Sequence, residues 1–154
     1  MKFDKVNMEV LKKCLKEKTV NYAKDDSWYY VFMDNNSGIY RIHKTDWYVD
    51  LEKDYPGGSR NHIRYFENAV KFFDVPVDAM LLNNTGELRI HPAQPKLTLA
   101  VFKTYNGEKI YIDTKLLANF ENYSLKSVGP RNVVFVYEGD LVVGVVMPVY
   151  IKED

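Results

Sequence analysis

The fold class is decided by the C-terminal stretch Val133-Val-Phe-Val-Tyr-Glu-Gly-Asp-Leu-Val-Val-Gly-Val-Val-Met-Pro-Val-Tyr-Ile151, the most apolar and most β-branched part of the chain. It predicts a strand at Val133–Tyr137, a turn in which Gly139 adopts a positive φ, and a second strand at Leu141–Ile151. Pro148 lacks an N–H, so strand pairing should stop near it or leave it at an edge. Because so apolar a hairpin is not stable alone in water, earlier parts of the chain must cover it.

Length and composition indicate one globular domain. The chain has 154 residues, 21 of them basic and 21 acidic, so its formal net charge is zero and no basic excess points to nucleic acid. A domain of this size buries roughly two thirds of its unfolded surface and needs no disulfide. The single cysteine excludes an internal disulfide, which predicts a cytoplasmic location. We find no signal-peptide pattern and no long apolar run, so we expect no membrane association.

The N-terminal third predicts a short strand, a helix and an antiparallel meander. Asn7 is a favoured N-cap residue, and apolar residues recur after it at helical spacing from Met8 to about Lys18. We expect Met8 and Leu11 on the buried face of this helix and lysines on the other face. The strands expected around it are Lys2–Val6, Trp28–Met33, Ile39–His43 and Trp47–Glu52.

The Pro-Gly-Gly break at residues 56–58 separates this meander from a second series of elements. Asp113 is expected to cap a short helix through Phe120 that buries Leu116 and Leu117 and exposes Lys115 and Asn119. The other expected elements are a helix from His62 to Phe73, strands Val77–Leu82 and Glu87–His91 around a turn at residues 83–86, and strands Leu97–Lys103, Lys109–Ile112 and Tyr123–Val128. The predicted class is α+β, with antiparallel sheets and two or three short helices.

The sequence carries no recognisable catalytic or metal-binding motif. Its histidines, His43, His62 and His91, have no ligand spacing, and no phosphate loop, dinucleotide fingerprint or Gly-x-Ser-x-Gly elbow is present. We therefore expect a protein that is not an enzyme and uses no metal and no cofactor. A carboxylate site around Asp46 and Asp50 is an open alternative, because sequence does not show side-chain geometry.

Three stretches stand in an informative order. They are Met1-Lys2-Phe3 with a helix carrying Val10-Leu11-Lys12, then Ile42-His-Lys-Thr-Asp-Trp-Tyr-Val-Asp-Leu51, and finally Val145-Val-Met-Pro-Val-Tyr-Ile151. This order resembles one domain of the bacterial DNA sliding clamp, the processivity β subunit of DNA polymerase III. The segment Ile110–Phe120 also resembles the second helix of a clamp domain. The resemblance implies a single clamp-like domain over residues 1–154, with an inserted helix and hairpin at about 55–95.

The resemblance also implies functional residues. In a clamp, two helices per domain line a central hole and the sheets form the outside. By that resemblance, sequence-independent contacts to double-stranded DNA would come from Lys12, Lys13, Lys16 and Lys115. The clamp's peptide groove includes its terminal Met-Pro strand, which implies peptide binding by Val145, Met147, Pro148 and Val149. An ordinary solvated helix face and ordinary strand core are the alternative interpretations of these two sets.

Two functions follow as hypotheses. The first is a non-enzymatic, clamp-like protein of DNA replication or repair, which contacts DNA or partner peptides and forms a ring only as a homo-oligomer. The second is a protein-interaction module of the phage or mobile-element type, which inhibits or mimics a host factor without binding DNA. Net neutrality favours the second hypothesis, and the segment Tyr55–Pro95 would then be its contact surface.

Overall fold

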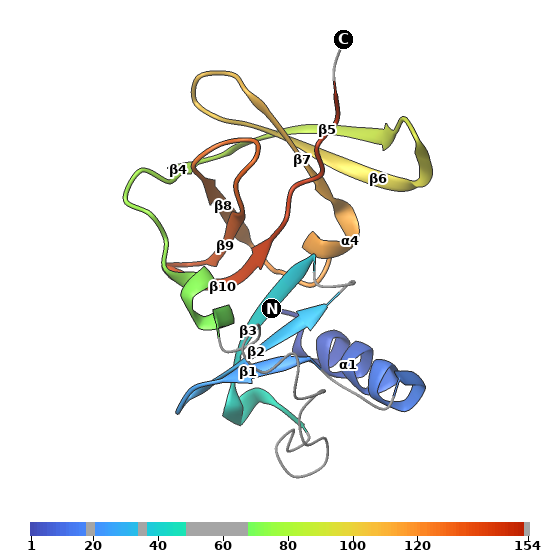
Figure 1. Cartoon of the computed structure of the whole chain (residues 1–154), viewed down its shortest axis with the longest axis vertical. Coiled ribbons are helices and arrows are strands. Elements are labelled where there is room, and N and C mark those ends of the chain that lie inside the picture. The colour runs from blue at the N-terminus through green and yellow to red at the C-terminus, as the bar shows by residue number, and fades with distance from the viewer. Residues whose placement is uncertain (18–20, 34–36, 49–67, 153–154) are drawn as a thin grey trace.

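Two antiparallel sheets build the protein. The computed structural model describes residues 1–17, 21–33, 37–48 and 68–152. The larger sheet has seven strands, and Figure 1 shows the smaller, three-stranded sheet at the opposite end of the molecule from α1. The large sheet consists, in spatial order, of β1 (Tyr22–Lys24), β2 (Trp28–Met33), β3 (Gly38–His43), β10 (Leu141–Val146), β9 (Val134–Glu138), β8 (Tyr123–Ser127) and β4 (Met80–Leu81). The predicted α+β class is confirmed.

The smaller sheet and the helices complete the fold. The small sheet consists of β5 (Asn83–His91), β6 (Gln94–Lys103) and β7 (Lys109–Asp113), in that order. The helices are α1 (Phe3–Glu17), α4 (Thr114–Leu117) and the 3-10 turns η1 (Lys44–Asp46) and η3 (Asn68–Phe73). Asp113 caps α4 as predicted, because its carboxylate accepts a hydrogen bond from the N–H of Lys115.

Six of the seven strands of the large sheet belong to two similar units, and β4 adds the seventh at one edge. Each unit is a helix followed by three antiparallel strands, namely α1-β1-β2-β3 and α4-β8-β9-β10. The two units meet at the centre of the sheet, where β3 and β10 pair with Tyr40 opposite Gly144. Strands that are far apart in the sequence are thus neighbours in the middle of the sheet.

Both helices pack on the same face of the large sheet. Val6 and Val10 of α1 and Leu116 of α4 belong to one buried cluster with side chains of β2, β3, β8, β9 and β10. The opposite face is covered by η3, whose Ala69 and Phe73 pack on a second cluster. Because both faces are covered, the strands of this sheet contain long apolar runs.

Several local predictions are confirmed. β9 and β10 form the expected hairpin, and Gly139 has a φ of 63°. The expected strand to Ile151 is shorter, because β10 ends at Val146, before Pro148. The tight turn before β7 has Gly107 at a φ of 88°, as an Asn-Gly pair favours.

The start of the chain differs from its prediction. Residues 3–6 are not a strand, because α1 already begins at Phe3. Asn7 is therefore no N-cap but an internal helix residue, whose side chain donates to the carbonyl of Phe3 and accepts from the N–H of Tyr48. Val6 and Val10 are buried, whereas Met8, expected inside, is half exposed.

The segment between η3 and β6 also differs from its prediction. Residues 83–86 form no hairpin turn, because β5 runs through them to His91 and pairs with β6. The short strand β4 pairs instead with β8 in the large sheet. The described part of the expected insertion, residues 68–95, therefore contributes to both sheets and to the core. Most of Trp47–Glu52 and the first half of the helix expected from His62 lie outside the described residues, and the second half of that helix is the 3-10 helix η3.

Candidate binding groove between β5 and α4

An open groove of about 450 Å³ lies between the small sheet and α4. Its floor consists of apolar side chains that belong to or pack against the main core: Ala100, Phe102, Leu117, Phe120 and Tyr123. Its rim carries Lys2, Glu87 and Leu88. The groove therefore offers a partner an apolar bottom between two opposite charges.

An irregularity in β5 shapes one wall of the groove. The pairing of β5 with β6 shifts register between Asn84 and Leu88. Gly86 has a φ of 73°, and the hydroxyl of Thr85 donates to the carbonyl of Val101 at 2.7 Å, which ties the bulge to β6. Beyond the bulge Leu88 lies opposite Ala100, on the groove side of the sheet, and its side chain is 65% exposed.

The other wall is α4 and the start of the chain. The hydroxyl of Thr114 donates to the carbonyl of Thr98, which holds the helix against β6. The N–H of Lys2 donates to the carbonyl of Asn119 at 2.9 Å, which places Lys2 at the rim. Contacts between residues this far apart in the sequence explain why the groove was not predicted.

Asn119 links three elements beneath this wall. It was expected to be exposed but is buried, because its amide donates to Glu9 of α1 and to the hydroxyl of Tyr40 on β3. That hydroxyl in turn donates to the carbonyl of Leu116 at 3.2 Å. The network fixes α1 and α4 relative to each other.

The lining of the groove is mainly apolar, with a few polar side chains. Among its lining residues there is no histidine or cysteine, and burial raises the pKa of Tyr123 above its ordinary value. The phenol therefore stays neutral near pH 7. An apolar floor with a few polar groups at its rim is typical of a site that holds a ligand.

The lysines expected to contact DNA are partly brought together. Lys12 and Lys16 are exposed on α1, and Lys115 is exposed on α4. The side chain of Lys13 lies outside the described part of the helix. Lys5, which was not among the expected residues, is also exposed and lies within about 40° of Lys12 and Lys16 around the helix axis.

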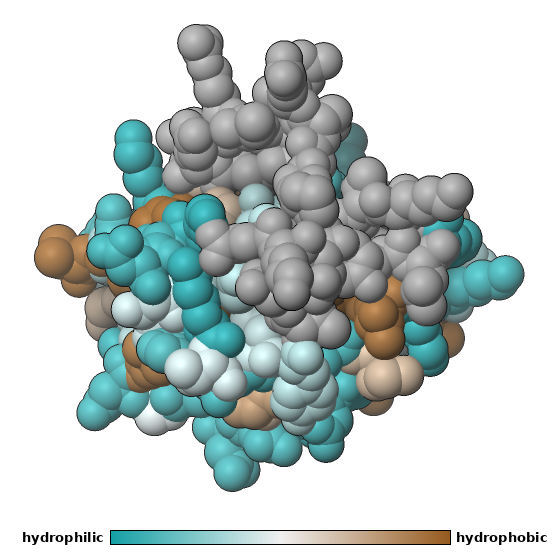
Figure 2. Space-filling view, turned by 90° about the horizontal axis from the view of Figure 1, so that it is seen from below, coloured by the Kyte–Doolittle hydropathy of each residue, from teal (hydrophilic) through white to brown (hydrophobic). Residues whose placement is uncertain are grey.

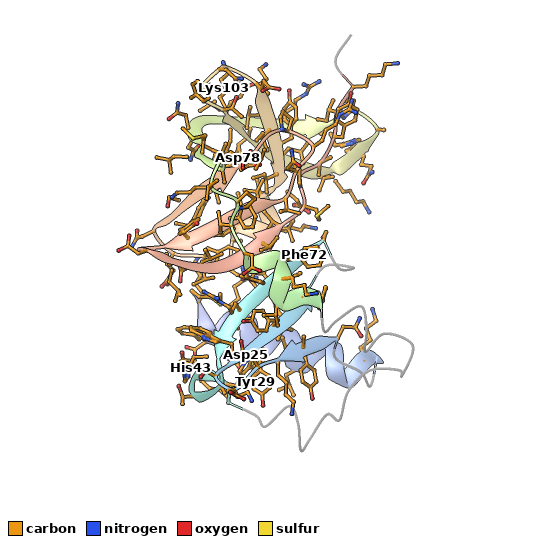
Figure 3. The ribbon with its side chains drawn as sticks, turned by 60° about the vertical axis from the view of Figure 1, so that its left-hand side comes forward. Asp25, Tyr29, His43, Phe72, Asp78 and Lys103 are labelled. Carbon is orange, nitrogen blue, oxygen red and sulfur yellow. The ribbon has the colours of Figure 1, made fainter. Side chains whose placement is uncertain are left out.

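The residues expected to bind a peptide do not share one groove. Val145 is buried and lines a hollow of about 50 Å³ together with half-exposed Met147 and Phe72, which Figure 3 shows on η3. After Pro148 the chain crosses to the small sheet, where the N–H of Val149 donates to the carbonyl of Tyr111 at 2.8 Å. Val149 therefore packs with a different apolar cluster.

A second polar cluster lies where β1, β2 and β3 meet, near the Asp25 label of Figure 3. Burial acts to raise the pKa of Asp25, but hydrogen bonds from Tyr30, Ser27 and Trp28, with the charge of Arg41, lower it overall. Burial and then the Asp25 hydrogen bond raise the pKa of Tyr30 to about 12. The Asp25 carboxylate thus accepts hydrogen bonds from three groups, and we assign the cluster a role in stability.

The described residues give no sign of the alternative carboxylate site. Asp46 is exposed at the end of η1, and Asp50 lies outside the described residues. Within residues 1–17, 21–33, 37–48 and 68–152, no group of three or more His, Cys, Asp or Glu side chains is placed to hold a metal ion. No helix in this part of the chain is long and apolar enough to cross a membrane.

Comparisons with known proteins add no relative. No family model, no curated protein and no solved structure matches this chain. Any function must therefore be argued from the geometry of the surface. In the view of Figure 2 the described surface is mostly hydrophilic, with small, separate apolar patches. No large contiguous apolar surface is visible from that side.

Proposed function

We propose that this chain is a non-enzymatic binding protein that takes an apolar side chain of a partner protein into the groove between β5 and α4. The groove itself is the observation that carries the proposal: about 450 Å³, floored by the core side chains Phe102, Leu117 and Phe120. Natural ligand pockets have volumes of roughly 300–1,000 Å³ and are lined mainly by apolar groups. The volume suits one or two large side chains.

The rim defines the chemistry of the partner. Lys2 and Glu87 place opposite charges at the groove, and Leu88 adds an exposed apolar edge. A segment with an aromatic or aliphatic residue flanked by both charge signs would match these features. The sliding-clamp resemblance also implies peptide binding, but at the residues of the terminal Met-Pro strand.

Filling the groove tests this proposal. Ala118 lines it and is only half buried, so Ala118→Trp adds bulk inside the groove without disturbing the core. Short peptides are selected from a random displayed library on the wild-type protein and titrated by fluorescence polarisation. We expect the selected peptides to carry an apolar or aromatic residue and to bind Ala118→Trp at least tenfold more weakly, about 1.4 kcal/mol.

Val128→Trp is the matched control, because Val128 is exposed and does not line the groove. It should bind the peptides as the wild type does. Equal affinity of Ala118→Trp and wild type would place the binding site elsewhere and refute the proposal.

Contact with DNA through α1 is a second candidate. Lys5, Lys12 and Lys16 form one exposed line on this helix. The arrangement of both helices on one face of a sheet also agrees with the sliding-clamp resemblance. Because the net charge of the chain is zero, any such contact would be local, weak and dependent on salt.

Charge reversal on α1 tests the DNA candidate. Each lost phosphate contact changes the slope of log K against log salt concentration by about 0.9, so Lys12→Glu with Lys16→Glu should reduce its magnitude by about 2. The control pair, Lys96→Glu with Lys103→Glu, carries the same charge change on β6, where both lysines are exposed. Identical duplex binding by the two double variants in low-salt titrations would exclude α1 as the contact.

A further inference from the structure

The strand β5 has an open edge. The small sheet has the order β5-β6-β7, so β5 and β7 are its outer strands. The edge of β7 is covered by the chain itself, because Val149 bonds to Tyr111. No strand in the described residues covers the outer edge of β5, and Figure 1 shows this strand at the end of the molecule far from α1.

The backbone groups on this edge are identified by the hydrogen bonds of β6. The carbonyl of Val101 accepts from Thr85 of β5, whereas the carbonyl of Thr98 accepts from Thr114, next to β7. Because backbone direction alternates along a strand, Leu99 also faces β5 and bonds to Arg89, the residue opposite it. The N–H and C=O groups of Leu88 and Ile90 therefore point away from the sheet.

The side chains on this edge are unusual for a free edge strand. Leu88 and Ile90 lie on one face and are 65% and 63% exposed. Soluble proteins commonly protect an edge strand with lysine or proline, and Asn83–His91 contains neither. The pairing of β5 with β6 is irregular before Leu88 and again between Ile90 and His91, so the regular part of this open edge is residues 88–90.

We infer that β5 pairs antiparallel with β5 of a second copy of this chain, with Leu88 opposite Leu88 across a two-fold axis. In this register the two leucines bond to each other through their outward backbone groups. Glu87 of each copy then lies opposite Arg89 of the other, which places opposite charges across the contact in addition to the hydrogen bond that Arg89 donates to the hydroxyl of Tyr111. Moving the two-fold axis from residue 88 to residue 89 would instead place Arg89 opposite Arg89, so charge complementarity favours the first register.

The same strand suits an identical partner for a simple reason. Glu87, Leu88 and Arg89 alternate between charged and apolar side chains, so an identical antiparallel strand places leucine opposite leucine and acid opposite base. An isologous contact of this kind closes after two copies. The added strand lies in the plane of the sheet, beside the groove, so the inference does not depend on what the groove binds.

Solution mass tests the inference on the full chain. Size-exclusion chromatography with light scattering should give twice the 18.0 kDa of one chain at high concentration, with dissociation on dilution. Leu88→Glu should be a folded monomer at every concentration, because it places like charges against each other in the centre of the contact. Leu141→Glu, at an exposed apolar position on β10, should still dimerise.

Two results would overturn the inference. One is that the wild type stays monomeric up to its solubility limit, as it would if β5 paired only with a strand of a different protein. The other is a Leu88→Glu variant that dimerises as Leu141→Glu does. Either result leaves the peptide titrations with Ala118→Trp unaffected, so the two proposals fail separately.

A cysteine cross-link tests the register. Opposite residues in a hydrogen-bonded antiparallel pair have Cα atoms about 5.5 Å apart, a distance that a disulfide spans. On oxidation Leu88→Cys should give a covalent dimer in high yield, and Ile90→Cys should not, with the wild type as control for Cys14. Preferential cross-linking of Ile90→Cys would overturn the pairing of Leu88 with Leu88.

Discussion

Alanine at position 144 is expected to destabilise the protein by about 3 kcal/mol, at the upper end of the usual cost of overpacking. Gly144 is buried at the centre of the large sheet, and a Cβ atom there would overlap the ring of Phe120, with Cε1 only 2.8 Å away. The ring does not easily move, because it packs against Tyr40 with centroids 5.2 Å apart. The change is measured as a shift of the urea unfolding midpoint.

Gly129→Ala is the matched control, because the nearest atom to its added Cβ, on Asn132, would be at 3.5 Å, an ordinary contact. It should change stability little. A Gly144→Ala variant as stable as Gly129→Ala would show that Phe120 does not pack on Gly144. If Phe120 packs on Gly144, Phe120→Leu should lower the free energy of unfolding by less in the Gly144→Ala background than in the wild type.

This contact matters for the groove as well as for stability. Phe120 forms part of the groove floor and also fills the space above Gly144. A Gly144→Ala variant that still folds at low temperature should therefore bind selected peptides more weakly, because its floor is displaced. Gly129→Ala should bind them normally.

Truncation of Leu116 to alanine is the second large effect, with an expected loss of about 3 kcal/mol, as for other fully buried leucines. Leu116 is 1% exposed and joins α4 to the main core. A Cβ atom added at Gly38 would lie 3.0 Å from the Cδ2 atom of Leu116. The same urea titrations measure the loss.

The space left by that truncation provides an internal control. Gly38→Ala alone is expected to be destabilising, because its methyl group would press on Leu116. In the Leu116→Ala background the same methyl group enters the vacated space and should restore up to about 0.8 kcal/mol. An equal cost of Gly38→Ala in both backgrounds would contradict this packing of α4 against β3.

Local patterns in the sequence predicted the elements that neighbouring residues alone can specify. The hairpin of β9 and β10, the Asn-Gly turn before β7 and the cap of α4 at Asp113 all agree with the structure. Each of these depends on residues that lie within a few positions of one another. The expected DNA-binding and peptide-binding roles stay predictions.

Elements whose state depends on distant contacts were predicted less well. Residues 3–6 alternate as a strand would, but they continue α1, because Val6 packs on the large sheet beside α4. Asn119 is of a residue type that is common at the surface, but inside the protein its amide N–H groups donate to Glu9 and to the hydroxyl of Tyr40. The expected turn residues 83–86 lie within a strand because Asn83 and Asn84 pair with β6 and the pairing resumes at Leu88 after the bulge.

The sequence by itself determined that this chain is an α+β protein of antiparallel strands with a very apolar C-terminal hairpin, since hydrophobic period and turn residues are local properties. Only the tertiary structure decided that β10 pairs with β3 and that a groove opens between β5 and α4. Those features depend on which distant surfaces pack together, and burial of apolar area is a sum over such contacts that no single stretch encodes.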